Sequence, residues 1–400
     1  MISNGSKSKV GYVTRPELIA AADKLPSNRE RSTLVHSLIK AYGLMERMDL
    51  VRPIPATKYD LEVFHSSEYV EFLFKAETLD SLSDEYLQNI ELFDLIDDCH
   101  VFPGLHSYVE WIAGASLAAA KSLVSGKHQT VLNWDGGRHH CQQDHASGFC
   151  YVNDIVLAIM EMRNRFSRIL YIDIDVHHGD GVESAFIASS SVLTLSFHRH
   201  ESGFFPGSGG NLDVGIGKGR YHALNVPLLS GMRGPNFVNL FRTVTQSTIN
   251  AYKPDAVFMQ CGVDGLSQDP LGGNWNLDTA SIGHCVQIVL DADLPAILSG
   301  GGGYNSAAAA CCWTHCTDLA VRKSETHSSD PNSFIHPPIA QDLPDHEYLD
   351  RYAPDYSLFS RLGNMRDLNT KEYLDTVIAK VQTHLDLQKN RVHSNLSSHK

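Results

Sequence analysis

The sequence contains no Cys-x-x-Cys pair, the spacing that many structural zinc sites use. Its eight cysteines are scattered along the chain, which argues against a zinc ribbon. Nothing in the sequence resembles a signal peptide, and no apolar run reaches the length of a transmembrane helix. We therefore expect a protein of a reducing interior compartment that does not associate with a membrane.

The chain also lacks an excess of positive charge. It has 33 lysines and arginines against 46 aspartates and glutamates, a formal net charge of −13. This balance argues against a direct nucleic-acid-binding surface. The glycines at 300–303 are continuous and no Gly-Lys-Ser/Thr follows them, which excludes a phosphate-binding loop.

The composition that remains is that of a soluble globular protein with a sizeable core, 42% hydrophobic and 20% charged. Its 400 residues could form one large α/β domain or two smaller ones. No internal repeat or strong linker divides the chain, so we expect a single domain. The 21 histidines favour metal or acid–base chemistry.

Hydrophobic patterns predict strands that alternate with helices. The predicted strands are 10–13, 130–134, 169–176, 192–197, 255–261 and 295–298. The predicted helices are 31–44, 67–76, 114–124, 153–165 and 374–387. This alternation indicates a mostly parallel sheet that is covered by helices on both faces.

The ends of the chain and one internal stretch have a different composition. We expect a disordered N-terminus over residues 1–8, one domain over 9–387 and a polar tail over 388–400. Residues 324–338 are rich in Ser, Pro, Asn and His, which predicts a surface insertion.

The stretch 168–181, RILYIDIDVHHGDG, carries the most unusual residues. A strand here would place Asp173 and Asp175 on one face, because side chains at i and i+2 point the same way. Burying two acids is costly unless they are paired or bind a metal. His177 follows Asp175 at the spacing of a metal-ligand pair. The alternative is a salt-bridged core acid beside an exposed loop histidine.

Polar residues follow other predicted strands in the same way. His139 and His140 follow one strand, Asp264 a second and Tyr304 a third. In α/β sheets, sites form in the crevice outside the carboxyl ends of the strands. We therefore expect these residues to converge on one pocket with Asp175 and His177.

Asp175, His177 and Asp264 together offer two carboxylates and one imidazole. Three protein ligands with an open position are typical of a catalytic zinc site. An oxygen, nitrogen and oxygen set also suits Fe(II), so the donor types alone do not fix the metal.

The remaining polar residues suggest acid–base chemistry beside such a metal. Asp173 and Asp180 could bond the far ring nitrogens of His139 and His140, which would fix the tautomers and raise the basicity. Tyr304 could donate its hydroxyl to a developing oxyanion. Taken singly, a His-His pair also fits a polar loop, and a tyrosine after glycines also fits a structural role.

Two aromatic residues lie in glycine-containing loops. Phe149 lies within 148–150 and Phe205 within 203–207. They could line an apolar channel for a long aliphatic chain, or they could pack beneath their loops.

With these residues in place, the chain resembles the class I zinc-dependent histone deacetylases over residues 10–358. The motifs that carry the resemblance are 133–140 (NWDGGRHH), 146–155 (ASGFCYVNDI), 172–183 (IDIDVHHGDGVE), 203–209 (GFFPGSG), 215–221 and 300–305 (GGGGYN). Residues 343–356 (LPDHEYLDRYAPDY) are most similar to the class I member that acts without a corepressor complex.

The resemblance implies an arginase-like single α/β domain with an eight-stranded parallel sheet. It implies a zinc enzyme that removes acetyl groups from lysine side chains of histones or other proteins, in the nucleus, the cytoplasm or both. A need for corepressor partners stays open.

The resemblance also assigns roles to single residues. It implies that Asp175, His177 and Asp264 bind zinc. The catalytic group would be His140 as general base and acid, oriented by Asp180; His139, backed by Asp173; and Tyr304, which polarises the acetyl carbonyl. Residues for substrate binding would be Gly148, Phe149 and Phe205 in the acyl-lysine tunnel, Leu271 at its rim and Asp98 on the substrate backbone.

Family members also carry monovalent cations, K⁺ or Na⁺. The corresponding inner site comprises Asp173, Asp175, His177, Ser196 and Phe197. The corresponding outer site comprises Phe186, Ser189, Val192 and His222, mostly through backbone carbonyls.

The chain departs from the family pattern beside the predicted site. Arg138 stands where the family usually has Trp or Leu, which places a cation beside the inner pocket. Gln142 and Gln143 replace lysines, and Val263 replaces an alanine before Asp264. These changes bear on substrate preference rather than on the core chemistry.

Three other functions are compatible with parts of the pattern. A two-metal ureohydrolase of the same fold needs an Asp-x-Asp pair, but Asp264-Gly265-Leu266 has no second acid. A small-molecule amide hydrolase, such as an acetylpolyamine amidohydrolase, would use the same pocket chemistry. A catalytically inactive acyl-lysine-binding scaffold is the third alternative.

Overall fold

A computed structural model describes residues 10–272, 275–326 and 336–397. Its strands form one parallel sheet in the order β2-β1-β3-β8-β7-β4-β5-β6. The strands are β1 Gly11–Val13, β2 Asp49–Val51, β3 Thr130–Asn133, β4 Ile169–Asp173, β5 Val192–Arg199, β6 Ala223–Leu228, β7 Ala256–Gln260 and β8 Ala296–Ser299. The prediction of a parallel eight-stranded sheet is confirmed for the described residues.

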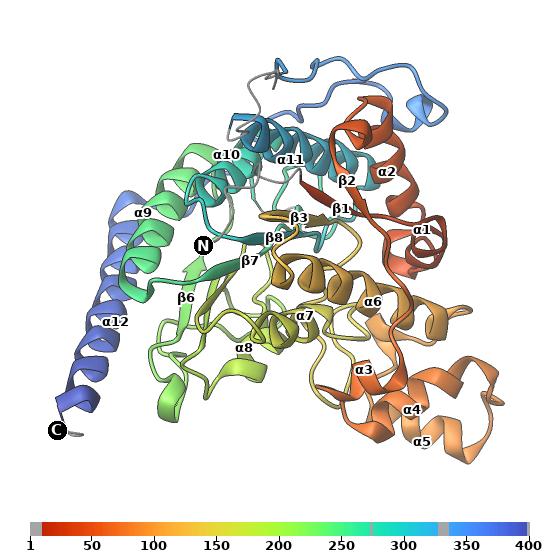
Figure 1. The fold of residues 1–400 in the computed structure, drawn as a ribbon, viewed down its shortest axis with the longest axis horizontal. Helices are drawn as coiled ribbons and strands as arrows, with labels where there is room; N and C mark the ends of the chain where they lie inside the picture. Colours follow the sequence, from red (N-terminus) through yellow and green to blue (C-terminus); the bar gives the residue numbers. More distant parts are fainter. Residues whose placement is uncertain (1–9, 273–274, 327–335, 398–400) are drawn as a thin grey trace.

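Helices cover both faces of this sheet (Figure 1). The helices are α1 Pro16–Ala22, α2 Arg31–Ala41, α3 Lys58–Glu62, α4 Ser67–Lys75, α5 Asp84–Leu92, α6 Leu105–Val124, α7 Asp154–Met162, α8 Asp180–Phe186, α9 Gly234–Tyr252, α10 Thr279–Leu290, α11 Ser306–Thr326 and α12 Lys371–Ser397. None of these helices combines the length and apolar character that a bilayer crossing demands.

The sheet separates two hydrophobic cores. Along β4, Leu170 and Ile172 face the core formed with α2, α9, α10, α11 and α12. Ile169 and Tyr171 face the other core, formed with α4, α6, α7 and α8. This alternation follows from the period of two in a strand, and it explains why the strands read as continuous apolar runs.

The structure corrects the predicted end of the central strand. β4 ends at Asp173 rather than at residue 176. The backbone N–H of Asp175 donates to Asp173 Oδ1 at 3.0 Å, so the chain turns locally instead of continuing the ladder. Asp175 therefore lies beyond the sheet edge, and a shared strand face is not what brings it near Asp173.

The limits of several other elements also differ from the prediction. Strands β2 and β6 and helices α1, α3, α5, α8, α9, α10 and α11 were not predicted. Helix α6 begins at Leu105 rather than at residue 114, since its first half also packs apolar residues. Helix α12 runs on to Ser397, so much of the predicted polar tail is helical.

Two predictions fall wholly or partly outside the described residues. The disordered N-terminus over 1–8 lies outside them. Of the predicted insertion at 324–338, residues 324–326 belong to the end of α11, and 327–335 lie outside the described residues.

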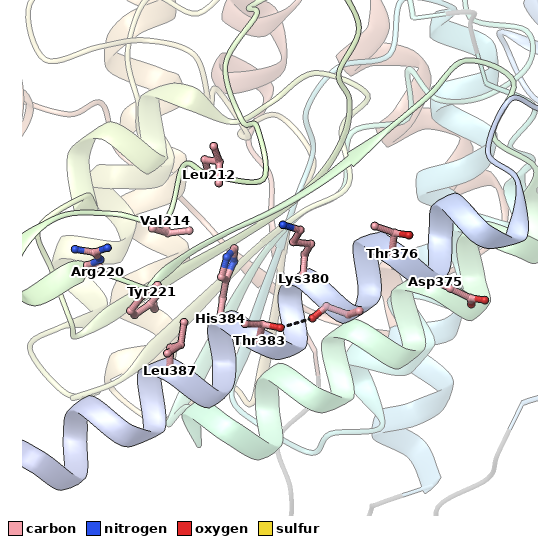
Figure 2. A pocket seen from close by; sticks show the side chains of 11 residues that line it. Leu212, Val214, Arg220, Tyr221, Asp375, Thr376, Lys380, Thr383, His384 and Leu387 are labelled. Atoms are coloured by element: carbon pink, nitrogen blue, oxygen red, sulfur yellow. Dashed lines mark hydrogen bonds between the residues drawn. The ribbon is translucent and has the colours of Figure 1, made fainter.

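Helix α12 runs beside α9 at one end of the sheet (Figure 1). Between α12 and the segment 212–221 lies an open groove of about 640 Å³. Figure 2 shows that Lys380 and His384 of α12 border this groove opposite Tyr221 and Val214.

Candidate active site

The four strands that lead into the predicted site residues are neighbours in the sheet. Their order is β3-β8-β7-β4. Because all four run parallel, the segments that follow them meet at one edge. Residues 138–140, 300–304, 260–264 and 175–180 therefore come together although they are far apart in the sequence.

Asp175, His177 and Asp264 meet at this edge. One ligand atom from each lies within 4.8 Å of those of the other two. His177 Nδ1 is 3.1 Å from Asp175 Oδ1 and 2.9 Å from Asp264 Oδ2. The structure thus brings together an imidazole nitrogen and one oxygen from each of two carboxylates.

The other oxygens of the two carboxylates are held by the protein. Asp175 Oδ2 accepts from Gln260 Nε2 at 2.9 Å and from the Gly302 N–H at 2.8 Å. Asp264 Oδ1 accepts from the Val176 N–H at 2.9 Å. These bonds leave the second oxygen of each carboxylate facing His177, whose backbone N–H also donates to Asp175 Oδ1 at 3.1 Å.

Glycines leave the space that these carboxylates occupy. A Cβ on Gly302 would lie 2.3 Å from Asp264 Oδ2, and a Cβ on Gly262 would lie 2.2 Å from Asp175 Oδ2. Any larger residue would push the carboxylates out of place. Glycine at both positions therefore fits a tightly packed ligand site.

The electrostatics of this group favour a cation. Burial and the neighbouring Asp175 raise the pKa of Asp264 to about 7. Against the effect of burial, hydrogen bonds to Asp175 and Asp264 raise the pKa of His177 to about 10. A proton on His177 offsets the two carboxylates, and a divalent cation bound to neutral His177 would satisfy the same oxygens. The donor set therefore fits a divalent metal ion.

His139 and His140 form a pair beside this group, with ring centroids 3.9 Å apart. His139 Nδ1 is 2.7 Å from Asp173 Oδ2, and His140 Nδ1 is 2.7 Å from Asp180 Oδ1. Each histidine therefore has the carboxylate partner that the sequence suggested.

The two histidines differ in their protonation. Burial lowers the pKa of His139, but the carboxylates of Asp173 and Asp175 outweigh it and raise this pKa to about 9. Burial and the neighbouring His139 lower the pKa of His140 to about 4. At neutral pH, His140 is therefore a neutral base beside a positively charged His139.

Tyr304 is positioned through its backbone. Its N–H donates to Asp269 Oδ2 at 2.6 Å, and the other oxygen of Asp269 accepts from the N–H groups of Leu271 and Gly272 at 2.9 and 2.8 Å. Burial, with Asp264 and Asp175, raises the pKa of Tyr304, so its hydroxyl keeps its proton. The phenol is available as a donor.

The predicted tunnel residues lie around His140 and Tyr304. The ring centroid of Phe205 is 4.9 Å from that of His140, and the ring centroid of Phe149 is 5.5 Å from that of Tyr304. A Cβ on Gly148 would lie 2.3 Å from His140 Cδ2, at φ +54. Only glycine fits here, so Gly148 lies directly against the histidine.

Two predicted substrate-binding residues are at the surface. Asp98 is exposed, and its carboxylate interacts with the Gly148 backbone N–H. Leu271 is 52% exposed and follows the Asp269 turn. Both positions suit contact with a peptide outside the tunnel.

The residues predicted for the monovalent cations lie in two places. Ser196 pairs with Asp173 across the β4 and β5 register, and Phe197 follows it. In the outer group, the Ser189 N–H donates to the Phe186 carbonyl at 2.8 Å. The His222 N–H donates to the Gly219 carbonyl at 2.8 Å, and the His222 carbonyl accepts from the Thr194 N–H at 2.9 Å. Cation binding at both places stays a prediction.

Some residues that support the site were missed. Gln260 holds Asp175, Asp269 holds Tyr304, and the Tyr171 hydroxyl donates to Asp173 Oδ2 at 2.6 Å. Phe204, rather than its neighbour Phe205, stacks on His177 with ring centroids 5.1 Å apart. Gln260 showed the same pattern as the predicted residues, a polar side chain at the end of a buried strand.

Comparison with known proteins is consistent with this geometry. Residues 25–320 match the histone deacetylase domain family. The chain is 39% identical over 386 residues to histone deacetylase 8 of Danio rerio, covering 96% of this chain and 97% of that protein. It is 37% identical over 376 residues to histone deacetylase 8 of Xenopus tropicalis, covering 94% and 97%. It is 39% identical over 371 residues to histone deacetylase HDAC1 of Drosophila melanogaster, covering 93% and 66%.

Proposed function

The chain belongs to the histone deacetylase family, and from this premise we propose that it hydrolyses acetyl-lysine at the site formed by Asp175, His177 and Asp264. Family membership makes the chain a hydrolase of acetylated lysine side chains. The assignment of single residues is our proposal, and the convergence of His140, Tyr304 and the three metal-binding candidates is the observation that supports it most.

Asp175, His177 and Asp264 would hold the metal, for which zinc is our first choice and Fe(II) the second. A divalent ion bound there supplies Lewis acidity, which polarises the acetyl carbonyl and lowers the pKa of bound water towards ~7. The buried carboxylates fit such an ion, because without a cation they would repel each other.

The protein residues would divide the proton transfers among them. His140 donates its Nδ1–H to Asp180, so Nε2 can take a proton from the attacking water and later give it to the leaving amine nitrogen. Tyr304 would donate a hydrogen bond from its hydroxyl to the acetyl oxygen, on which negative charge develops when water adds to the carbonyl carbon. His139, whose pKa is raised chiefly by the carboxylate of Asp173, would add a positive charge beside the reaction.

The tunnel would accept the lysine side chain with its acyl group leading. Phe149 and Phe205 would contact the methylene chain, with Gly148 leaving room beside His140. Asp98 and Leu271 would contact the peptide at the mouth. We further propose K⁺ or Na⁺ at the two groups described above, acetylated histones or other proteins as substrates, and a location in the nucleus, the cytoplasm or both.

Hydrolysis of acetyl-lysine peptides by the full chain tests this proposal. Activity should disappear with a chelator and return with zinc. Tyr304→Phe should lower kcat by about 100-fold or more, the range for loss of one oxyanion donor, while the fold and metal content are unchanged. Tyr59→Phe is the matched control, because Tyr59 is 79% exposed.

Three outcomes would reject the proposal. Two tightly bound Mn²⁺ ions per chain would favour a ureohydrolase. Faster hydrolysis of acetylpolyamines than of acetyl-lysine peptides would favour a small-molecule amidohydrolase. Binding of acyl-lysine peptides without zinc-dependent hydrolysis would favour an inactive scaffold.

A further inference from the structure

Arg138 is a buried cation directly beside the proposed catalytic histidines. It precedes His139 in the segment that follows β3, and only 5% of its surface is exposed. Its backbone N–H donates to Asp154 Oδ1 at 2.7 Å, which fixes the position of the residue. The side chain is thereby held within the protein at the same edge of the sheet as the site.

The guanidinium of Arg138 has few partners. One terminal nitrogen donates to the Asp135 carbonyl at 3.3 Å, and Nε has no hydrogen-bond partner. A guanidinium carries five N–H donors, and burying it without an anion is energetically costly. Most of its hydrogen-bonding capacity is therefore unused.

The nearby carboxylates are bonded to other groups. Asp135 Oδ2 is 2.9 Å from His36 Nε2. Asp154 accepts from Ser116 Oγ and from the backbone N–H of Gly137, besides that of Arg138. Among the described residues, no ion pair joins a carboxylate to the Arg138 guanidinium. The part of the chain that the structure describes therefore supplies no carboxylate in direct contact with this cation.

Two further donors surround Arg138. Arg31 is also buried, at 4% exposure, and acts on Arg138 electrostatically. Its NH1 donates to the carbonyls of Gly301 and Gly303, at 3.0 and 2.9 Å, which ties it to the segment before Tyr304. The buried hydroxyl of Tyr108, another electrostatic neighbour of Arg138, has no hydrogen-bond partner.

Both arginines adjoin proposed catalytic residues along the chain: Arg138 directly precedes His139, and Arg31 is bonded to the carbonyl of Gly303, which directly precedes Tyr304. The groups that act on Arg138 electrostatically include Cys150 and Tyr304. Cys150 in turn acts electrostatically on Tyr304 and is influenced by Asp175. An acyl group held by Tyr304 would extend toward the two arginines.

We propose that Arg138, with Arg31 and the Tyr108 hydroxyl, binds a carboxylate at the inner end of the acyl site, so that the enzyme accepts acyl-lysines whose acyl chain ends in a carboxylate. This inference rests on the proposed function. Two guanidiniums and a hydroxyl are hydrogen-bond donors, and a carboxylate suits them better as a ligand than any neutral group does. Water supplies hydroxide to the acyl carbon and a proton to the lysine nitrogen, which releases a dicarboxylate and a free lysine.

The test compares peptides that differ only at the end of the acyl chain. The zinc-loaded full chain is assayed on acetyl-lysine, on succinyl- and glutaryl-lysine, and on size-matched analogues that end in a carboxamide. Wild type should favour carboxylate over carboxamide in kcat/KM by about tenfold or more, as expected for a charge-assisted hydrogen bond. Arg138→Leu should lower that ratio at least tenfold, and Arg138→Lys should retain part of it.

Two controls separate this effect from other causes. Arg163→Leu also removes one positive charge, but Arg163 is exposed at the end of α7 and should leave the ratio unchanged. Thermal unfolding of each variant identifies losses that come from misfolding, and Arg138→Lys provides a second folded variant if Arg138→Leu is unstable.

Hydrolysis of acetyl-lysine releases acetate, and the carboxylate of this product could occupy the same subsite. Inhibition by free acetate is therefore measured in parallel, and a weaker inhibition of Arg138→Leu than of wild type would assign the subsite to the product. Equal rates on carboxylate and carboxamide peptides, with equal acetate inhibition, would overturn the inference. If the wild-type protein does not hydrolyse acetyl-lysine peptides, that result would instead reject the proposed function itself.

Discussion

A buried carboxylate can position a candidate catalytic residue in this protein without facing the substrate itself. Asp269 is 5% exposed, and its two oxygens accept four backbone N–H groups, among them that of Tyr304. It thereby joins the segment that carries Tyr304 to the turn that carries Leu271. Asp269 is a positioning residue, because its bonds reach the proposed reaction only through Tyr304.

We expect Asp269→Asn to lower kcat by roughly tenfold, with little change in zinc content. An amide places an NH₂ group against backbone donors, so it loses bonds that cost about 1–3 kcal/mol each when left unmade. Steady-state kinetics and metal analysis of the purified variant measure both effects.

A double variant distinguishes positioning from general destabilisation. If Asp269 acts through Tyr304, then Asp269→Asn should have a much smaller effect on kcat in the Tyr304→Phe background. Equal effects in both backgrounds would show that Asp269 does not position the phenol. Asp278→Asn is a control at a half-buried helix start, where the carboxylate caps α10 by accepting from the Ser281 N–H.

Elements are joined at the site by polar residues rather than by apolar packing alone. His65 lies between α3 and α4, and its Nδ1 donates to the Gln143 carbonyl at 3.1 Å. Its Nε2 accepts from the Asn153 N–H, at the start of α7, at 3.0 Å. His65 therefore connects the loop after His140 to two helices, and this arrangement requires a neutral imidazole.

The pH dependence of stability should reflect His65. Burial lowers the pKa of His65 to about 4 in the folded protein, whereas the ordinary value is 6.5. Between these values the unfolded chain binds a proton that the folded chain does not, so stability falls as the pH drops from 6.5 to 4. The full loss from this residue is ~3 kcal/mol.

Urea denaturation of wild type and His65→Gln across this pH range measures the effect. Glutamine can donate to Gln143 and accept from Asn153 but does not titrate, so its stability should fall less steeply with pH. Identical slopes for the two proteins would show that His65 does not contribute. The neutral-pH stabilities provide the control for the substitution itself.

The C-terminal helix α12 covers one end of the whole sheet. β6 is an edge strand, and α12 covers it through Val377, Val381 and Leu385, which are at most 2% exposed. The Tyr373 hydroxyl also donates to the Pro227 carbonyl of β6 at 3.0 Å. These contacts protect an edge that could otherwise pair with another chain.

Val381→Asp should destabilise the protein by about 3 kcal/mol or more, because it places an unpaired charge in this apolar stripe. Thermal and urea denaturation measure the loss. Gln382→Asp adds the same charge at the next, exposed position and should change stability by less than about 0.5 kcal/mol. Equal stabilities of the two variants would mean that α12 contributes little to closing the sheet.

The sequence alone determined the long strands and the residues that follow them. Buried parallel strands need continuous apolar runs, and polar residues directly after such runs are unusual enough to be recognised. This pattern, with the family motifs, predicts Asp175, His177, Asp264 and Tyr304 as site residues. Short elements escaped it, because β2 has three residues and β6 contains Pro227.

Only the tertiary structure decided which residues support that site. The order β3-β8-β7-β4 differs from the order along the chain, so the partners of each site residue depend on which strands become neighbours. Gln260 beside Asp175 and Asp269 beside Tyr304 follow from that order. The same holds for Arg138: its identity is plain in the sequence, but only the packing of the surrounding segments leaves it without a carboxylate partner among residues 10–272, 275–326 and 336–397.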